Sequence, residues 1–244
     1  MKLTNQKMVV IGVQARSNNH RLPGKLFKKI NNIEIIDHVI VQVKESEFYV
    51  NKFTHKHNMV VDSYLLIPED DKKINEFRNK KIKIIYGSED DVLSRYCNLF
   101  EKTDPDFIVR ITSDCPMIPS PLISRAITIA NAGSYDFVSN AHPEFRTFYD
   151  GSDVEVISKK MFEYLMTIAK RKEEREHVTL SLYSKEIPSR FKMGHIFSDI
   201  DYSEYKFSVD TNEDFMSVKD NMEKVIEKKK KWIELYGKSN CHRF

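Results

Sequence analysis

The sequence predicts an α/β fold in which helices flank a mostly parallel β-sheet. Short apolar runs rich in β-branched residues alternate along the chain with longer segments of helical periodicity, a pattern typical of βαβ units. The chain has 244 residues, a length at which a single α/β core is the ordinary outcome. We therefore expect one domain over residues 1–244.

The expected strands are the short apolar runs. The five clearest are residues 8–13, 59–67, 82–86, 107–112 and 135–139. Weaker candidates are residues 154–157, 191–197 and 205–209. Residues 44–58 show no clear period, so we expect an irregular or inserted segment there.

Three helices are expected among these strands. Ser88 and Asp91 resemble an N-terminal capping pair ahead of residues 92–100, whose apolar side chains share one face. A second helix covers residues 119–130, between two opening prolines and a terminating glycine. A long third helix covers residues 212–235.

Composition and charge narrow the class of protein. Charged residues make up 31% and hydrophobic residues 41% of the chain, which suits a folded protein rather than a disordered or membrane one. The formal charge of +3 is too small to indicate a nucleic-acid partner, and no run approaches the roughly 20 apolar residues of a membrane span. Three widely spaced cysteines without a C-x-x-C pair fit a cytoplasmic protein.

The loop after the first expected strand is unusually basic. It carries Arg16, His20, Arg21 and Lys25, and its single glycine, Gly24, follows a proline. Cations between a buried strand and a helix suit a polyphosphate, because backbone N–H groups and the helix start supply donors beside the charges. The loop matches neither the Walker A pattern nor G-x-G-x-x-G, and a basic surface loop explains the composition equally well.

Two further apolar runs end in an aspartate. Asp114 follows the strand at 107–112, and Asp210 follows the run at 205–209. Because the carboxyl ends of parallel strands meet at one edge of a sheet, Asp210 and Asp114 can face each other. Mg²⁺ binds one or two carboxylates together with water and phosphate oxygens, so the pair is a candidate metal site. The alternative for an isolated Asp114 is a turn cap.

Two other polar stretches are unusual for loops. They are RTFYDGSDVEV at residues 146–156 and REHVT at residues 175–179. His177 has no H-E-x-x-H partner, which argues against a catalytic zinc site. The sequence supports no Ser-His-Asp or Cys-His pairing for nucleophilic catalysis.

Together these motifs resemble those of a known family. VQARSNNHRLPGK is similar to the A-R-x-G-S-x-R-L-P-G-K signature of the cytidylyltransferases that make CMP-activated sugar acids, CMP-KDO synthetases included. The SpsF-type branch, named for spore-coat polysaccharide biosynthesis, is matched in order by YGSEDDVLSRY, VRITSDCPMI, DGSDVEV, REHVT and SVDTNEDF. The match covers about residues 8–220.

The resemblance implies a Rossmann-like nucleotidyltransferase fold with a small β-containing dimerisation extension, in a homodimer. Residues 146–197 are the implied acceptor-binding or dimerisation subregion. The implied activity is Mg²⁺-dependent transfer of CMP from CTP to a KDO-like or nonulosonate-like sugar acid, with release of pyrophosphate, for cell-surface polysaccharide.

Two alternatives to this activity stay open. The first is a nucleotidyltransferase that uses another nucleoside triphosphate or a phosphorylated acceptor. The second is a non-catalytic nucleotide-binding protein, suggested by Asn18 and Asn19, which stand where the family has Gly-Ser. Glycine there would allow positive φ and a close approach to phosphate, and Asn is the next most tolerant residue.

The resemblance also assigns roles to individual positions. The implied catalytic residues, the last two of which are also the implied metal ligands, are Arg16, Lys25, Asp114 and Asp210. The implied nucleotide-binding residues are Gln14, Ala15, Arg16, Arg21, Lys25, Ser113 and Asp114. The implied acceptor-binding residues are Asp153, Glu155, Arg175 and His177.

Overall fold

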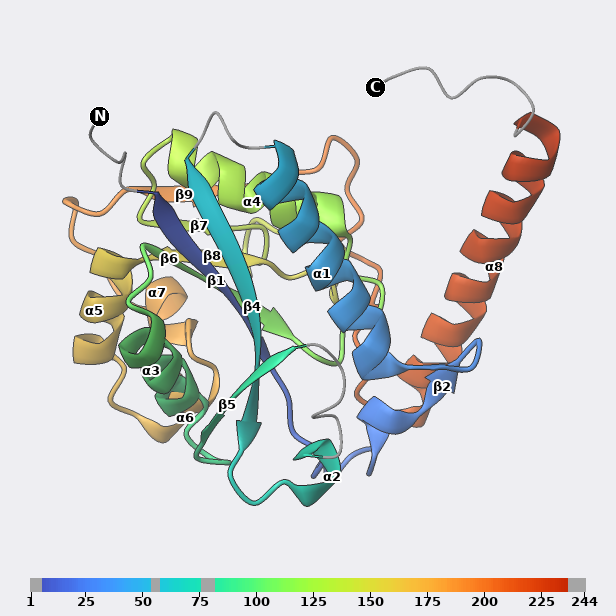
Figure 1. Ribbon diagram of the computed structural model, residues 1–244, viewed down its shortest axis with the longest axis horizontal. Helices are drawn as coiled ribbons and strands as arrows, with labels where there is room; N and C mark the ends of the chain where they lie inside the picture. Colours follow the sequence, from blue (N-terminus) through green and yellow to red (C-terminus); the bar gives the residue numbers. More distant parts are fainter. Residues whose placement is uncertain (1–5, 54–57, 76–81, 237–244) are drawn as a thin grey trace.

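The protein is built on one seven-stranded sheet, seen in a computed structural model that describes residues 6–53, 58–75 and 82–236 (Figure 1). In spatial order the strands are β5 (Lys83–Gly87), β4 (Met59–Pro68), β1 (Lys7–Gln14), β6 (Phe107–Thr112), β8 (Glu155–Ser158), β7 (Phe137–Ser139) and β9 (Met193–His195). Four of the six neighbouring pairs are parallel, and β8 runs antiparallel to both of its neighbours. The expected mostly parallel α/β sheet is confirmed.

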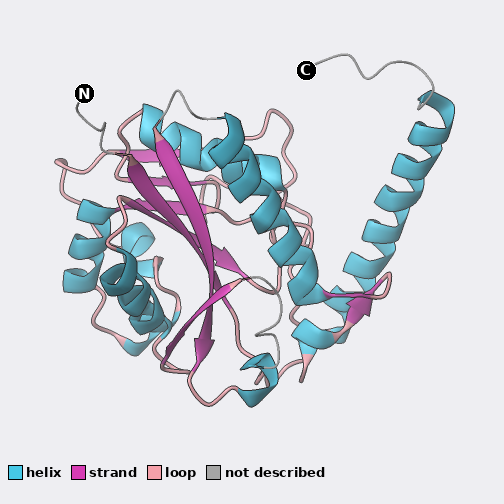
Figure 2. Cartoon of the chain, viewed as in Figure 1, coloured by secondary structure: helices cyan, strands magenta, loops and turns pink. Residues whose placement is uncertain are grey.

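Helices cover both faces of this sheet (Figure 2). The larger helices are α1 (Ile35–Phe53), α3 (Val92–Thr103), α4 (Ser120–Ala132), α5 (Lys159–Ile168) and α8 (Asn212–Tyr236). The shorter ones are η1 (Lys25–Phe27), α2 (Lys72–Asn75), α6 (Lys172–Glu176) and α7 (Leu180–Ser184). A separate antiparallel pair consists of β2 (Lys29–Ile30) and β3 (Ile33–Glu34).

The alternation of side chains along β1 divides the core into two layers. Val9, Ile11 and Val13 pack in the cluster that contains α1 and α4, whereas Val10 packs in the cluster that contains α3 and α5. A side chain at Gly12 would place its Cβ 2.7 Å from a ring carbon of the Tyr96 side chain. Glycine therefore lets α3 lie close against β1.

The predicted helix starts are confirmed. Asp91 caps α3 by accepting a hydrogen bond from the Ser94 amide, and the Asp91 amide donates to the Ser88 hydroxyl. Helix α4 follows Pro119 and ends before Gly133, as the prolines and the glycine predict. The last helix also covers the predicted range, and its Val218 is buried in the core.

The expectation of an irregular segment at residues 44–58 is wrong for its first part, because α1 continues to Phe53. Val43, Ser46 and Val50 form its buried face, so the helical period is present but a serine interrupts the apolar pattern. The Ser46 hydroxyl accepts a hydrogen bond from Ser124 of α4, which satisfies it inside the core. Residues 54–57 lie outside the described part of the chain.

The later strands differ from their predicted ranges. Both strands within residues 146–197, β8 and β9, belong to the main sheet, so the described residues form no separate β-containing extension there. The run at 191–197 is a strand only over β9, which has one neighbour, the three-residue β7. Residues 205–209 contribute one bridge, between Lys206 and Asp150, which brings the segment before Asp210 beside Asp150.

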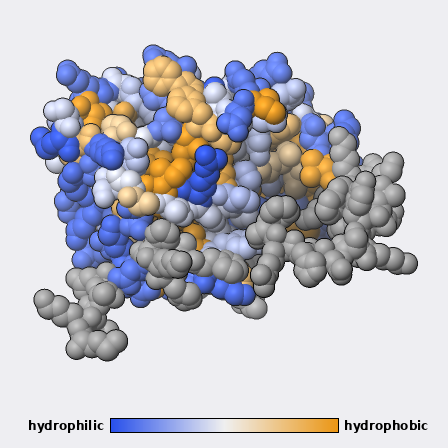
Figure 3. All heavy atoms as spheres, turned by 90° about the horizontal axis from the view of Figure 1, so that it is seen from above, coloured by the Kyte–Doolittle hydropathy of each residue, from blue (hydrophilic) through white to orange (hydrophobic). Residues whose placement is uncertain are grey.

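The surface seen from above is mostly hydrophilic, with hydrophobic side chains gathered in a smaller patch near its middle (Figure 3). Within the described ranges, none of the helices combines the length and the apolar character that crossing a membrane requires.

Candidate functional site

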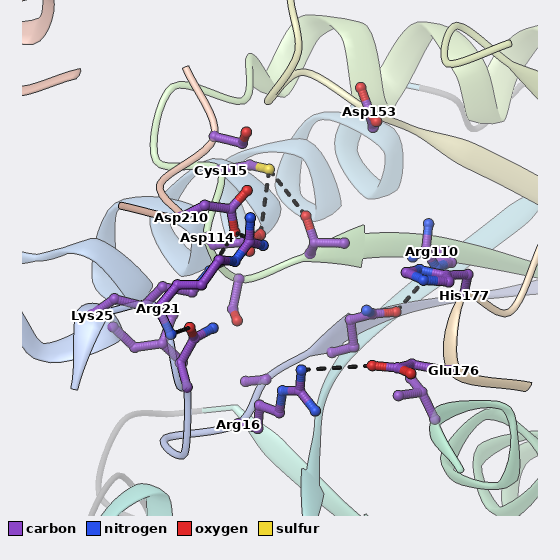
Figure 4. A pocket seen from close by; sticks show the side chains of 18 of the residues that line it. Arg16, Arg21, Lys25, Arg110, Asp114, Cys115, Asp153, Glu176, His177 and Asp210 are labelled. Carbon is purple, nitrogen blue, oxygen red and sulfur yellow. Dashed lines mark hydrogen bonds and ion pairs between the residues drawn. The ribbon is translucent and has the colours of Figure 1, made fainter. Parts of the chain in front are cut away.

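A cavity of about 370 Å³ lies at the carboxyl ends of β1 and β6, where parallel α/β sheets bind ligands (Figure 4). The predicted site residues that line it are Gln14, Ala15, Arg16, Arg21, Lys25, Ser113, Asp114, Asp153, His177 and Asp210. Ten of the twelve predicted residues are therefore brought together, although they come from distant parts of the chain. The two that do not line the cavity are Glu155 and Arg175.

The centre of the site is an ammonium between two carboxylates. The Lys25 Nζ donates to Asp114 Oδ2 at 2.8 Å and to Asp210 Oδ1 at 3.1 Å. Its third partner is the carbonyl oxygen of Val209, at 2.7 Å. The Lys25 side chain is only 5% exposed, so this cation is held inside the wall of the cavity. The prediction that the two aspartates lie close together is thus supported by one shared partner.

Local structure holds each member of this group in place. Lys25 opens η1 directly after Gly24, whose φ of +69° is left-handed and favours glycine. The Val209 amide donates to the Asp114 carbonyl at 2.9 Å, which ties the two acidic segments together. The amide of Asp210 donates in turn to the carboxylate of Asp214, an N-terminal residue of α8.

Two further cations contact Asp210. Arg21 reaches Asp210 Oδ1 at 2.9 Å, and Lys206 lies 3.4 Å from Asp210 Oδ2. Burial by itself raises the pKa of Asp114, but the Lys25 ammonium outweighs it and holds that pKa below its ordinary value. The Asp114 side chain is therefore a carboxylate at neutral pH.

The basic loop is anchored at its start. The Ser17 amide and hydroxyl both donate to the Asp71 carboxylate, each at 2.6 Å, and Asp71 is buried. Asn19 accepts hydrogen bonds from two amides of its own loop, those of Arg21 and Leu22. The Asp71 carboxylate was not predicted from sequence, because nothing in its own segment indicates this partner.

The two asparagines do not adopt the left-handed conformation that glycine would allow at their positions. Neither Asn18 nor Asn19 has positive φ, and Gly24 is the left-handed residue of this loop. Asn18 and Asn19 therefore introduce no strained backbone conformation into this loop.

Arg110 is a site residue that sequence reasoning missed. It stands in β6 and lines the cavity, where its Nε donates to Gln14 Oε1 at 3.0 Å. Since arginine only donates, the oxygen of the Gln14 amide must face Arg110, which leaves the amide nitrogen as a donor. Burial lowers the pKa of Arg110, but Glu155 and its other neighbours outweigh it, so the pKa is raised. A charged residue inside a strongly apolar strand was the available signal.

Glu155 lies behind Arg110 rather than at the cavity surface. Its Oε2 is 2.5 Å from Arg110 Nη1, and its Oε1 accepts hydrogen bonds from Thr179 at 2.8 Å and Tyr183 at 2.6 Å. The side chain is 2% exposed. The predicted acceptor contact is therefore not supported for Glu155, because its carboxylate is consumed by internal partners.

The remaining predicted acceptor residues divide into two groups. Asp153 lines the cavity and forms a two-pronged pair with Arg146, at 2.8 and 3.0 Å. Burial raises the pKa of Asp153, and the Arg146 guanidinium offsets part of this effect. His177 also lines the cavity, at the end of α6. Arg175 instead pairs with Asp91, and this ion pair joins α6 to the start of α3. The predicted contact between Arg175 and the acceptor is therefore not supported.

Comparisons with known proteins agree with this geometry. The family model described as Cytidylyltransferase matches residues 9–239. The chain is 24% identical over 217 residues to the spore coat polysaccharide biosynthesis protein SpsF of Bacillus subtilis, covering 85% of this chain and 83% of SpsF.

Two solved structures share the fold. A cytidylyltransferase from Leptospira borgpetersenii matches with a TM-score of 0.76 and 27% identity, covering 96% of this chain and 99% of the other. The CMP:2-keto-3-deoxy-manno-octonic acid synthetase complexed with CTP matches with a TM-score of 0.63 and 14% identity, covering 88% of this chain and 98% of the other. Because the family match spans most of the sequence and these structures share its architecture, the protein belongs to the cytidylyltransferase family.

Proposed function

We propose that the protein transfers CMP from CTP to an acidic sugar and releases pyrophosphate. The observation that carries this proposal is the convergence of Asp114 and Asp210 in one cavity. The basic loop after β1 lines the same cavity with Arg16, Arg21 and Lys25. A paired carboxylate beside a cationic loop is the arrangement that metal-assisted transfer to or from a polyphosphate requires. The family and the CTP complex of a structural neighbour favour cytidine as the base.

The carboxylate pair suits Mg²⁺. Both side chains already point at one positively charged atom, and two carboxylates completed by water and phosphate oxygens are ligands that Mg²⁺ takes in proteins. Asp114 and Asp210 would hold the ion. Bound there, Mg²⁺ supplies charge that polarises a phosphoryl oxygen and stabilises the charge developing during transfer.

The cationic loop binds the nucleotide tail in this proposal. Arg16 and Arg21 have side chains that are 39% and 65% exposed, so both can reach an entering triphosphate. Their charges stabilise the departing pyrophosphate, because fixed cations act most strongly where negative charge accumulates. Gln14 ends β1, Ala15 follows it, and both line the cavity, where they contact the nucleoside in this proposal.

The acceptor enters from the side of Asp153 and His177. In the close view these residues lie apart from the Lys25 group, beyond Asp114 (Figure 4). The carboxylate of Asp153 accepts a hydrogen bond from an acceptor hydroxyl, and an acidic sugar supplies such hydroxyls. Its orientation is held by Arg146 on both oxygens.

Pyrophosphate release tests the proposal. The protein is incubated with Mg²⁺, one of the four nucleoside triphosphates, and either a KDO-like or a nonulosonate-like acid, and the product is identified by mass. We expect a CMP conjugate with CTP only. A conjugate of another nucleotide, or one formed only with a phosphorylated sugar, would assign the open alternative. Nucleotide binding that raises the melting temperature without any product would indicate a non-catalytic protein.

Asp114→Asn is the matching variant. It should lower the rate of pyrophosphate release by a factor of a hundred to a thousand, about 3 to 4 kcal/mol, as loss of one fixed electrostatic group does. Asp220→Asn, at an exposed position of α8, is the control and should leave the rate unchanged. A folded Asp114→Asn protein with full activity would contradict the role of the pair.

The homodimer expected from the family resemblance is part of the proposal. Light scattering on the purified protein tests it directly, and a monomeric mass at working concentration would contradict it.

A further inference from the structure

We propose that Lys25 is an internal counter-ion that holds the Asp114–Asp210 pair together in the metal-free protein and leaves the pair when a divalent cation binds. The inference rests on the metal role proposed above for these aspartates. It adds an exchange of cations that precedes nucleotide transfer.

The ammonium is fully used in its present position. Its three N–H donors match three acceptors, one oxygen of Asp114, one oxygen of Asp210 and the carbonyl of Val209, at 2.8, 3.1 and 2.7 Å. With 5% of the side chain exposed, no donor is left for a phosphate oxygen. Lys25 can therefore bind a triphosphate only after it moves.

A divalent cation needs the same oxygens. Mg²⁺ binds oxygen at about 2.0 to 2.1 Å, and the two oxygens that converge are the ones Lys25 holds. The remaining oxygens have other neighbours: Asp114 Oδ1 lies 3.6 Å from the Cys115 sulfur, and Asp210 Oδ2 lies 3.4 Å from the Lys206 ammonium. Two cations on one pair of oxygens repel each other strongly at such separations, so metal binding expels the ammonium.

The structure leaves room for this movement. Lysine carries its charge on a flexible four-carbon stem. Gly24, the preceding residue, has no heavy atom within 4 Å of the place where a side chain would begin, so the backbone before Lys25 is not packed in on that side. The cavity beside it is lined by Arg16 and Arg21, which makes a released ammonium the third cation facing a polyphosphate.

Two other cations on Asp210 serve as matched controls. Arg21 lies 2.9 Å from Asp210 Oδ1 and is 65% exposed, and Lys206 is 41% exposed. Removing either deletes one positive charge from the same carboxylate. Neither removal frees the converging oxygens of both aspartates.

The test measures Mn²⁺ affinity by electron paramagnetic resonance on nucleotide-free protein. Lys25→Met should bind Mn²⁺ at least about tenfold more tightly than the wild type, because the competing cation is gone. Arg21→Met and Lys206→Met should change the affinity by less than about fivefold, as exposed ion pairs do. Adding Asp114→Asn to Lys25→Met should abolish the gain.

The possible results distinguish failure of the cation exchange from failure of the proposed metal role of Asp114 and Asp210. Equal or weaker Mn²⁺ binding by Lys25→Met overturns the exchange and leaves the metal role of the aspartates intact. Mn²⁺ binding that Asp114→Asn leaves unchanged in an otherwise wild-type protein contradicts the metal role itself, and the exchange with it.

A second measurement uses the wild-type chain and needs no variant to fold. Lysines are labelled with acetic anhydride in the absence of nucleotide, with and without saturating Mn²⁺, and the labels are read by mass spectrometry. Lys25 should be protected without the ion and labelled severalfold more with it, while Lys83, paired with Asp62 elsewhere, should not change. Unchanged labelling of Lys25 at saturating Mn²⁺ overturns the proposal.

Discussion

Replacing Glu155 by glutamine should cost folding stability, although the family resemblance assigned this residue to acceptor binding. The carboxylate is 2% exposed and lies 2.5 Å from Arg110 Nη1, with Thr179 and Tyr183 on its other oxygen. Glutamine keeps the shape but removes the charge, which leaves the Arg110 guanidinium without its anion at 13% exposure. Removing one partner of a buried pair costs about 3 to 5 kcal/mol, and we expect about 3 because an acceptor oxygen remains.

Urea unfolding followed by circular dichroism measures this cost. Asp153→Asn is the matched control, since Asp153 also pairs with an arginine but is 26% exposed at the cavity, and it should cost about 1 kcal/mol. The double variant Arg110→Gln with Glu155→Gln should lose less than the sum of its single variants, because both charges leave together. If Glu155→Gln unfolds like the wild type while the KM for the acceptor rises, the acceptor role is right and this reasoning is wrong.

Three other substitutions test the site and its support. Asp71→Ala removes both acceptors of Ser17, so it should loosen the basic loop and raise the KM for CTP, measured by pyrophosphate release, with little change in melting temperature; an unchanged KM would contradict the anchoring role. Burial raises the pKa of Asp114, but the opposing effect of Lys25 is larger, so the pKa in the folded protein lies below the ordinary value of about 3.9. The stability that the ionised Asp114 contributes is therefore complete above that pH and is lost as the pH falls through the folded pKa. The melting temperature of Asp114→Asn, measured by thermal unfolding, should accordingly fall less than that of the wild type as the pH is lowered from about 5 to about 2. Gly151→Ala should destabilise by about 1 to 3 kcal/mol, because φ is +102° and the added carbon would meet backbone atoms at 2.6 Å; urea unfolding at wild-type stability would refute this.

The predictions that held depend on short-range signals. The N-cap at Asp91, the prolines before α4 and the glycine after it act within a few residues of where they stand, so their motifs are readable in the sequence. The helix α1 was missed because the contact that explains its sequence pattern is long-range. Ser46 interrupts its apolar face, and the hydroxyl that satisfies this serine comes from α4.

The sequence predicted which kinds of residue line the site, but not which of them contact each other. Asp114 and the cations of the first loop were assembled as predicted, because the parallel strands β1 and β6 bring their carboxyl ends to one edge. Asp210 also reached this edge, but it follows a segment that forms a single bridge rather than a strand. Arg110 was overlooked and Glu155 misassigned. Their pairing across β6 and β8 depends on the antiparallel register, which no local pattern encodes.

The sequence by itself determined the class of fold, the order of its motifs and the chemical groups available at the strand ends, since periodicity and turn chemistry operate over a few residues. Only the tertiary structure decided which of those groups meet. Lys25 and Asp210 are separated by 185 positions along the chain, yet the bridge at Asp150 and Lys206 and the packing of η1 bring them within hydrogen-bond distance. Because interactions between charges depend on distance in space and on burial, the position of Lys25 between two carboxylates is a property of the folded chain alone.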